Sequence, residues 1–279
     1  MIIIELEQKK SRYLEKIKQL RLMDDTFFNS CFDGNIPYME VVLRAVMGNE
    51  CLHVTEVFTQ QNAPNLYGRS VRFDALATDG VAIYNVEIQR SDEGAIPRRA
   101  RYNSSMIDAR TVSKGTEFPD LPETYVIFIT EHDIWKRGKP LYKVLRTFED
   151  TADAFDDGAH ILYVNGECQS DSPLGRLVHD FFCTNPNDMY SEVLAERARF
   201  FKEDEKGVTA MCRVMEELYN EGVAIGEVRG EVRGEIRGAE TERIKNIKSL
   251  IQRMGITAEA AMDALNIAKN DQPKYLTLL

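Results

Sequence analysis

The sequence predicts an α/β fold with a mixed central sheet, followed by a helical C-terminal extension. Residues 71–90, VRFDALATDGVAIYNVEIQR, alternate polar and apolar side chains on both sides of Asp79-Gly80, which is typical of a β-hairpin. Residues 96–112 have helical spacing. The continuous apolar run TYVIFIT (124–130) comes next and is typical of a strand buried on both faces. A strand, a helix and a buried strand in this order predict a right-handed crossover between parallel strands.

The elements on either side of this segment complete the expected layers. Before the hairpin we expect an amphipathic helix over 5–22, a short helix capped by Asp24 or Asp25, a helix from Pro37 to Gly48 and a strand over 51–60. After the buried strand, two further strands are expected at 141–148 and 160–166.

From Pro173 onward the pattern becomes helical. Two helices are expected in LGRLVHDFFCT and DMYSEVLAERARFFKED, then a long helix from Gly207 or Val208 and a short helix capped by Thr257. The long helix contains the repeat GEVRGEVRGEIRG, with glycines at four-residue spacing: Gly222, Gly226, Gly230, Gly234 and Gly238. Each glycine costs about 1 kcal/mol relative to alanine in a helix. Three interpretations stay open: a soft linker, a stripe that admits a second helix beside Val228, Val232 and Ile236, or a repeat without a specific role.

The expected hairpin collects polar side chains on one face. With Asp79-Gly80 as a two-residue loop, Asp74 lies opposite Asn85 and Phe73 opposite Val86. Because side chains alternate along a strand, one face then holds Arg72, Asp74, Asn85, Glu87 and Gln89, and the other holds Phe73, Ala75, Ala77, Ala82, Tyr84, Val86 and Ile88. Asp74 and Glu87 become diagonal cross-strand neighbours, about 7–8 Å apart at the backbone.

Two carboxylates that repel each other at this spacing predict a bound divalent cation, because Mg²⁺ prefers hard oxygen ligands. The competing interpretation is that Asp74 and Glu87 are ordinary acidic residues on the exposed face of a hairpin. A three-residue loop, or carboxylates that point to opposite faces of the sheet, would overturn the cation site and the function that is inferred from it.

Composition narrows the class of protein. The chain has 279 residues, 43% of them hydrophobic and 29% charged, as in globular proteins. No apolar run is long enough to cross a bilayer, and charged residues follow the opening MIII at once, so neither a membrane span nor a signal peptide is expected. Five cysteines without CxxC spacing favour reduced thiols and a cytoplasmic location.

The net charge of −10 argues against indiscriminate binding to nucleic acid. One segment directly after the hairpin is nevertheless basic, and it holds Arg90, Arg98, Arg99, Arg101, Arg110 and Lys114 against three acidic residues. Such a segment suits a site that meets phosphate only where the chemistry occurs. The motifs HExxH, GxSxG, GxxxxGK[ST] and a strand-linked GxGxxG are absent. His179 and Cys183 lie four residues apart, a weaker signal than a full set of metal ligands.

The order of elements and three strings resemble one family of enzymes. The strings VRFDALATDGVAIYNVEIQ, RRARYNSSMIDA and YVIFIT, with Asp74 and Glu87-Ile88-Gln89 in the first, resemble the PD-(D/E)XK nuclease superfamily, and more narrowly its recombination-promoting, transposase-associated branch. The resemblance covers residues 24–166 and implies a restriction-endonuclease-like αβββαβ core. It also implies hydrolysis of phosphodiester bonds in DNA with Mg²⁺, for which Mn²⁺ would substitute.

The resemblance assigns roles to individual residues. Asp74, Glu87 and the carbonyl of Ile88 would bind the metal, and Gln89 stands where the superfamily usually has a lysine. Glutamine carries no charge, so phosphate would be bound by Arg98 and Arg101, with Tyr102 beside them. Phe73 replaces the proline of the family pattern. An upstream acid would be Asp25 or Glu40, and Asp25 is preferred because of its place at the start of the first family helix.

The sequence therefore predicts a metal-dependent endodeoxyribonuclease whose C-terminal helices form a homo-oligomer. The expected segments are an N-terminal helix (1–23), a nuclease-like domain (24–170), a helical subdomain (171–221) and a glycine-repeat helix with a helical tail (222–279). The alternative is a catalytically weak or inactive nuclease fold that acts as an oligomerising interaction module.

Overall fold

The computed structural model describes residues 2–65, 68–112, 115 and 117–279, with side chains described from residue 11 onward. The chain forms two compact units, Met1–Val214 and Met215–Leu279. Each unit is described by itself. The four segments expected from the sequence stay a prediction.

The helices and strands have the following bounds. The strands are β1 (Glu56–Ala63), β2 (Val71–Thr78), β3 (Ala82–Gln89), β4 (Glu123–Thr130), β5 (Leu141–Val144) and β6 (Ala159–Asn165). The α-helices are α1 (Ile2–Gln19), α2 (Asp25–Phe32), α3 (Ile36–Met47), α4 (Pro97–Thr111), α5 (Pro173–Phe182), α6 (Glu192–Glu203), α7 (Glu205–Met254), α8 (Ala258–Ala264) and α9 (Gln272–Leu276). Short 3₁₀ turns are η1 (Asp92–Ala95), η2 (Phe118–Asp120) and η3 (Pro186–Asp188).

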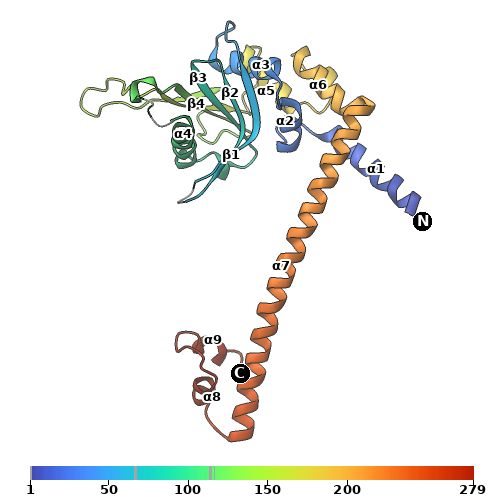
Figure 1. Ribbon diagram of the computed structural model, residues 1–279, viewed down its shortest axis with the longest axis vertical. Coiled ribbons are helices and arrows are strands. Elements are labelled where there is room, and N and C mark those ends of the chain that lie inside the picture. The colour runs from blue at the N-terminus through green and yellow to red at the C-terminus, as the bar shows by residue number, and fades with distance from the viewer. Residues whose placement is uncertain (1, 66–67, 113–114, 116) are drawn as a thin grey trace. The chain divides into compact units, whose positions relative to one another are not determined.

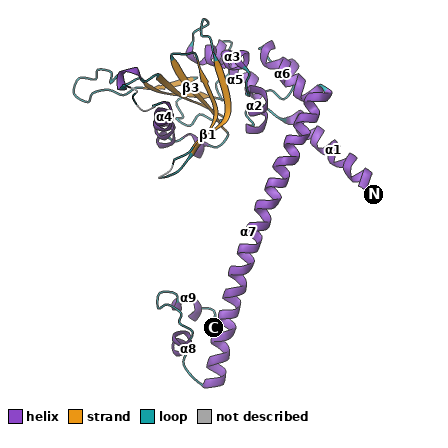
Figure 2. Ribbon diagram, viewed as in Figure 1, coloured by secondary structure: helices purple, strands orange, loops and turns teal. Residues whose placement is uncertain are grey.

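The first unit is built on a six-stranded mixed sheet with the order β1-β2-β3-β4-β6-β5. The pairs β1–β2, β2–β3 and β5–β6 are antiparallel, and β3–β4 and β4–β6 are parallel. Helix α4 connects β3 to its parallel neighbour β4 and lies on one face of the sheet, whereas α2 and α3 lie on the other (Figures 1 and 2). The predicted α/β class, the mixed sheet and the crossover with parallel strands are confirmed.

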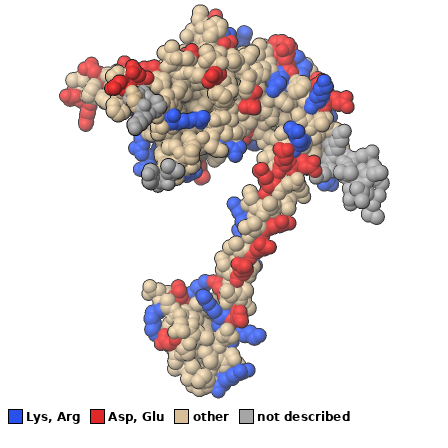
Figure 3. Space-filling view, in the orientation of Figure 1, with Lys and Arg blue, Asp and Glu red and all other residues tan. Residues whose placement is uncertain are grey.

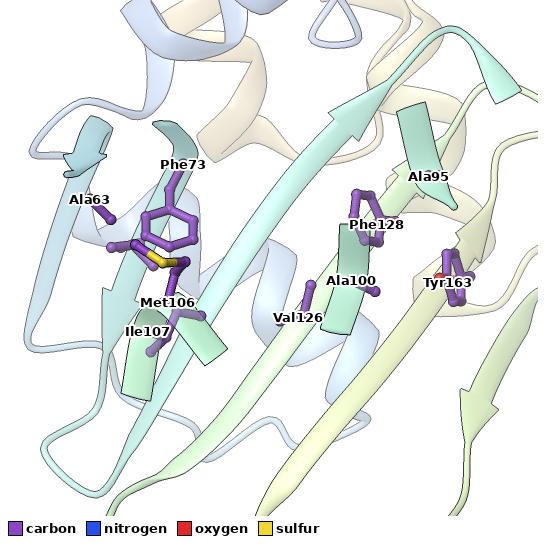
Figure 4. Packing of buried hydrophobic residues seen from close by; sticks show 10 residues of the cluster. Ala63, Phe73, Ala95, Ala100, Met106, Ile107, Val126, Phe128 and Tyr163 are labelled. Carbon is purple, nitrogen blue, oxygen red and sulfur yellow. The ribbon is translucent and has the colours of Figure 1, made fainter. Parts of the chain in front are cut away.

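Apolar side chains of the sheet and of α4 form one core. Met106 of α4 lies beside Phe73 of β2 (Figure 4), and Ile107, Leu76 and Phe128 belong to the same buried cluster. Phe128 in turn stacks on the ring of Tyr163 at 5.4 Å. This core fixes α4 over the centre of the sheet, and α4 therefore holds its polar residues in place above β3.

A second core lies on the other face and is aromatic. Phe28 stacks on Phe32 with ring centroids 4.2 Å apart, and both rings lie 6.2 Å from Phe181 of α5. All three side chains are fully buried. Helix α2 is thereby tied to the C-terminal helices of the unit, and its first residue, Asp25, is held close to the sheet.

The hairpin between β2 and β3 differs from the expected one. Three residues, Asp79 to Val81, separate the strands, so the two-residue loop predicted at Asp79-Gly80 is wrong. The Asp79 carboxylate accepts hydrogen bonds from the N–H groups of Val81 and Ala82 at 2.9 and 2.7 Å, and Gly80 has a φ of 90°. Local side-chain bonding by Asp79 therefore selects the longer turn, an effect that aspartate commonly has in turns.

Ala82 pairs with β4 only, so the last pair of the hairpin is Thr78–Ile83, and the register differs from the expected one by two residues. Ala75 pairs with Val86 and Leu76 with Asn85, so the expected pairs Asp74–Asn85 and Phe73–Val86 are wrong. The strand bounds leave three residues between β2 and β3, which is one of the two conditions stated above, but the paired residues enclose four, Asp79 to Ala82, so the register does not shift by one residue. Because side chains alternate with a period of two, a shift of two residues keeps the faces unchanged. It moves Glu87 from a diagonal position to the place opposite Asp74.

Both β1 and β2 are kinked beside the two carboxylates. Gln60 has a φ of 53°, a left-handed conformation that is uncommon outside glycine. Thr59 donates a hydrogen bond to Asp33 at the end of α2, whereas Gln61 accepts one from Arg110 of α4, so the side chains two residues apart reach opposite faces. Phe73 accordingly joins the core under α4, and its predicted place on the face opposite Glu87 is wrong.

The second unit is helical. Ile247 of α7 packs with Met262 of α8 and Tyr275 of α9 in a small core of its own. Thr257 caps α8, where its side chain accepts the N–H of Ala260, as expected. The glycine repeat is part of α7, and a Cβ added at any of its five glycines would meet no described atom within 4 Å.

Among the residues that the structure describes, no helix combines the length and the apolar composition needed to cross a membrane.

Candidate functional site

Asp74 and Glu87 meet where β2 and β3 separate. The paired residues of the two strands end at Ala75 and Val86, and side chains bond the backbone beyond that point. Asp74 Oδ2 accepts the N–H of Ile88 at 3.2 Å, and the N–H of Asp74 donates to Glu87 Oε1 at 3.4 Å. Each carboxylate is thus fixed by the strand that carries the other, and the two acids converge as the sequence predicts.

Glu87 is a fully buried carboxylate inside a polar network. Asn85 Nδ2 donates to Glu87 Oε1 at 2.9 Å, and Asn103 Nδ2 of α4 donates to Asn85 Oδ1 at 3.2 Å. Arg99 Nη2, also from α4, donates to Glu87 Oε2 at 2.7 Å. A buried charge of this kind persists only where it is paired and hydrogen-bonded, and α4 supplies the charged partner, Arg99, together with Asn103, which holds Asn85 in place.

Burial raises the pKa of both acids, and repulsion by neighbouring carboxylates adds to it at Asp74. Burial is the larger cause at Asp74, and the nearby carboxylates of Glu87 and Asp25 add to it, so the pKa of Asp74 rises to about 7. Burial also raises the pKa of Glu87, while the bonds from Asn85 and Arg99 act in the opposite direction. The site therefore holds more negative charge than its own partners neutralise, a condition that favours a cation.

Asp25 is the nearest upstream acid. Its pKa is raised, mainly by burial and then by Asp24, and its charge in turn raises the pKa of Asp74. Glu40, the other candidate, bonds Arg44 at 2.8 Å and the N–H of Val54 at 3.1 Å on the far side of α3. Asp25 therefore lies close enough to act on Asp74, whereas Glu40 is hydrogen-bonded to residues outside the site.

Gln89 ends β3 and packs against Gly94. A Cβ built on Gly94 would lie 1.7 Å from Gln89 Oε1, so the glutamine side chain in this orientation lies directly against the backbone of Gly94. Gly94 also accepts a hydrogen bond from Arg99 Nη1 at 3.0 Å through its carbonyl. Gln89 and Arg99 therefore meet at the same backbone residue, next to the carboxylates.

The predicted phosphate-binding residues lie apart from the carboxylates. Arg98 and Arg101 are exposed on α4, and neither side chain bonds any part of the chain that the structure describes. The hydroxyl of Tyr102 bonds the loop between β1 and β2, accepting from Asn65 and donating to the carbonyl of Arg69. Lys114 lies outside the described residues.

Arg99 and Asn103 are the residues of this site that sequence reasoning missed. They lie four residues apart on α4, and Asn103 falls in the same helical stripe as the buried Ala100 and Ile107. The available signal was a polar residue, Asn103, within a buried apolar stripe and one turn after Arg99. The sequence could not show that Asn103 bonds Asn85, because the position of α4 over β3 follows from tertiary packing.

A second cluster of polar side chains lies at the end of α5. It consists of His179, Asp180 and Cys183, and one potential ligand atom of each lies within 4.8 Å of the others. Among the described residues, this is the group of three His, Cys, Asp or Glu side chains that come this close together. The Asp180 carboxylate already accepts the N–H groups of Tyr190 and Ser191 at 2.7 and 2.8 Å. Its role is to fix the turn before α6, and burial raises the pKa of the Cys183 thiol to about 11.

The two cavities found in the first unit do not include the carboxylates. One, of about 580 Å³, lies between α3 and α5, with Arg44 and Arg176 beside Glu50 and Asp171 in its lining. The other, of about 190 Å³, is apolar and lies between Phe58, Ile83 and Ile107. The first cavity is lined by charges of both signs, and the second lacks polar groups that converge on one point. The carboxylate cluster is therefore the stronger candidate for a functional site.

Comparison of the chain with protein-family models, with curated proteins and with solved structures found no match, so the function has to be inferred from these residues themselves.

Proposed function

We propose that the protein is a divalent-metal-dependent endodeoxyribonuclease with a restriction-endonuclease-like core, of the transposase-associated kind, that acts on DNA in the cytoplasm. The observation that supports this most directly is the convergence of Asp74 and Glu87 at the point where β2 and β3 separate. The order of strands and helices around the two acids agrees with the family resemblance of residues 24–166.

The donor set suits a hard cation such as Mg²⁺ or Mn²⁺. Asp74 and Glu87 contribute carboxylate oxygens, Ile88 contributes its carbonyl, and Asp25 adds negative charge nearby. Asp74 Oδ1 accepts no hydrogen bond from the described residues, so one oxygen is open to a ligand. A bound cation would activate a water molecule and stabilise the charge that develops on the phosphate.

The chain itself would orient the reacting groups. Asn85 and Asn103 hold the Glu87 carboxylate in one orientation. Gln89, fixed against Gly94, can hydrogen-bond either a water or a phosphate oxygen. Water would add to phosphorus while the bond to the leaving ribose oxygen breaks, and the leaving oxygen takes up a proton. Positive charge for the phosphate comes from the arginines of α4, since Gln89 carries none.

Cleavage of supercoiled plasmid DNA with Mg²⁺ or Mn²⁺ tests this function. We expect cutting by the unmodified protein and its loss in Asp74→Asn and Glu87→Gln, which keep the size of each side chain. Asp92→Asn is the matched control, because Asp92 is an exposed acid in η1, close in sequence but with no role in the site.

Cutting that persists in both site variants would assign the activity to other residues. No cutting by the unmodified protein would favour the alternative, in which the nuclease fold serves an interaction module. That alternative has an observation of its own in α7.

The second candidate function is self-association through α7. One face of this helix carries a row of apolar side chains that are 45–59% exposed: Leu218, Ile225, Val228, Val232 and Ile236. At about 100° per residue, the glycines lie two positions, hence about 200°, from Val228, Val232 and Ile236. The two rows therefore face opposite ways, and a second helix would contact either the glycine stripe or the apolar row; we propose the apolar row.

Charged rows flank the apolar row and indicate a second copy of this chain as its partner. Glu227, Glu231 and Glu235 precede the apolar residues by one position, and Arg229, Arg233 and Arg237 follow them by one. Figure 3 shows both charges on the surface of α7. Within one helix, like charges lie four residues apart and repel. A parallel pair sets the glutamates of each helix against the arginines of the other, whereas an antiparallel pair sets like against like.

The mass of the full chain in solution, by light scattering, tests this pairing. We expect a dimer that becomes a monomer in the double variant Val228→Lys/Val232→Lys. The double variant Gly230→Lys/Gly234→Lys places the same charges on the opposite face and should remain a dimer. A monomeric unmodified protein, or loss of the dimer in both variants, would contradict pairing through the apolar row.

A further inference from the structure

Arg99 occupies the position that a cation bound by Glu87 would need. Its Nη2 lies 2.7 Å from Glu87 Oε2, and the other oxygen of Glu87 is already bonded by Asn85 and by the N–H of Asp74. The guanidinium charge also acts on Asp74 and Asp25, whose pKa values it lowers. Arg99 is thus the positive charge shared by the three acids of the site.

The two partners of this ion pair differ in their freedom to move. The Glu87 side chain is fully buried and held by three hydrogen bonds, whereas 36% of the Arg99 side chain is exposed. The guanidinium lies over the ring of Phe128, 5.8 Å from its centroid, and its second bond goes to the carbonyl of Gly94 at the surface. When the pair separates, Arg99 is therefore the residue that moves.

We propose that Arg99 has two positions: paired with Glu87 in the metal-free protein, and on a phosphate of the nucleic acid once a divalent cation occupies Asp74 and Glu87. The inference rests on the proposed nuclease function. A cation and a guanidinium repel each other at a shared carboxylate, so arrival of the metal releases Arg99. The freed guanidinium is a bidentate donor suited to phosphate, and it lies beside Gln89, which brings no charge.

The exchange makes two predictions of opposite sign. Removal of the arginine charge takes away a competitor of the metal, so Mg²⁺ binds more tightly to the protein without DNA. The same change removes a phosphate contact, so DNA binds more weakly in the presence of the metal. A residue that only positions Glu87 would instead weaken the binding of Mg²⁺ when it is removed.

Titration calorimetry with the full chain measures the first effect. We expect Arg99→Gln to lower the Kd for Mg²⁺ about three- to tenfold, the size of a half-exposed charge interaction, and Arg99→Lys to leave it within about twofold. Arg110→Ala is the control, because Arg110 lies on the same helix and bonds Gln61 instead. Circular dichroism checks that each variant is folded.

Fluorescence anisotropy with a phosphorothioate duplex, which resists hydrolysis, measures the second effect. With Mg²⁺ present, Arg99→Gln should weaken binding about fivefold or more, and Arg99→Lys should restore most of it. Weaker Mg²⁺ binding in Arg99→Gln, or unchanged DNA binding, overturns the exchange and leaves the nuclease proposal standing. Absence of Mg²⁺ binding in the unmodified protein overturns both.

Discussion

Proteins usually bury apolar side chains and expose charged ones, and two regions of this molecule do the opposite: the carboxylate site and the apolar face of α7. The site places charge in the interior, where Glu87 is fully buried and bonded by Asn85 and Arg99. Helix α7 exposes apolar side chains such as Val228 and Ile236 to solvent. Buried charge and exposed apolar rows are the two observations that ordinary folding does not explain. We propose that a ligand inside the unit explains the first and a partner outside it the second.

The two regions also differ in how they tolerate substitution. Around Glu87 each polar atom is the partner of another, so one substitution leaves several groups unpaired. Along the glycine repeat of α7 the apolar side chains Val228, Val232 and Ile236 are about half exposed, so we expect substitutions there to act on association and to leave the fold unchanged. The following predictions order these effects from the largest to the smallest.

The largest expected effect is the loss of Asn85. This residue is fully buried, and its amide donates to Glu87 and to the carbonyl of Ala75 while it accepts from Asn103. Asn85→Ala removes three hydrogen bonds from buried groups and should lower the free energy of unfolding by about 3 kcal/mol. Urea denaturation measures it. The exposed Asn62→Ala is the control, and equal effects of the two substitutions would contradict a network that depends on burial.

The next effect depends on pH and concerns Asp74. Its carboxyl is protonated in both states below pH 4, and the unfolded chain loses the proton near 3.8 whereas the folded protein keeps it up to about pH 7. The contribution of Asp74 to stability therefore falls between pH 4 and 7 and stays low above pH 7. Asp74→Asn should raise the free energy of unfolding by about 3 kcal/mol at pH 8 and leave it nearly unchanged at pH 4.

Urea midpoints across this pH range, without divalent metal, measure the difference between Asp74→Asn and the unmodified protein. A gain that is the same at pH 4 and pH 8 would show that neither burial nor the neighbouring acids raise the pKa of Asp74 in the folded protein. The same reasoning predicts that the unmodified protein releases protons when it binds metal at pH 6.

A smaller effect separates charge pairing from apolar contact in α7. Changing Glu227, Glu231 and Glu235 to arginine should weaken the dimer about tenfold, because arginine then faces arginine in the parallel pair. The chain with Arg229, Arg233 and Arg237 changed to glutamate is the complementary variant. An equimolar mixture of the two chains should form heterodimers, and a mixture that stays unpaired would contradict the parallel arrangement.

The smallest effect concerns the glycines. A Cβ at Gly230 would meet no described atom, so Gly230→Ala should stabilise α7 by about 1 kcal/mol without weakening the dimer. Thermal melting followed by helix ellipticity measures the gain. A weaker dimer in Gly230→Ala would show that the glycine row, and not the apolar row, contacts the partner.

The alternation of the strands was sufficient to predict the sheet and the convergence of Asp74 and Glu87. Alternation has a period of two, so the prediction survived a register shift of the same size. The turn was mispredicted because Asp79 bonds the backbone of Val81 and Ala82, a local preference that the Asp-Gly pair does not reveal. The kink at Gln60, and with it the place of Phe73, depends on contacts with both α2 and α4.

The partners of the carboxylates could not be predicted in the same way. Sequence spacing placed Arg98 and Arg101 on one side of α4, yet Arg99 reaches Glu87, because the rotation of α4 follows from the packing of Met106 and Ile107 on the sheet. Asp25 comes near Asp74 only because the aromatic core positions α2. Residues far apart in the chain thus complete a site whose centre lies in one hairpin.

The central claim is that Asp74 and Glu87 together hold one divalent cation. Titration of the full chain with MnCl₂ at pH 7.5, followed by calorimetry, tests it most directly. The structure predicts one ion per chain, with binding lost in Glu87→Gln, strongly weakened in Asp74→Asn and unchanged in Asp92→Asn. Absence of binding by the unmodified protein, or binding that survives in Glu87→Gln, would contradict it.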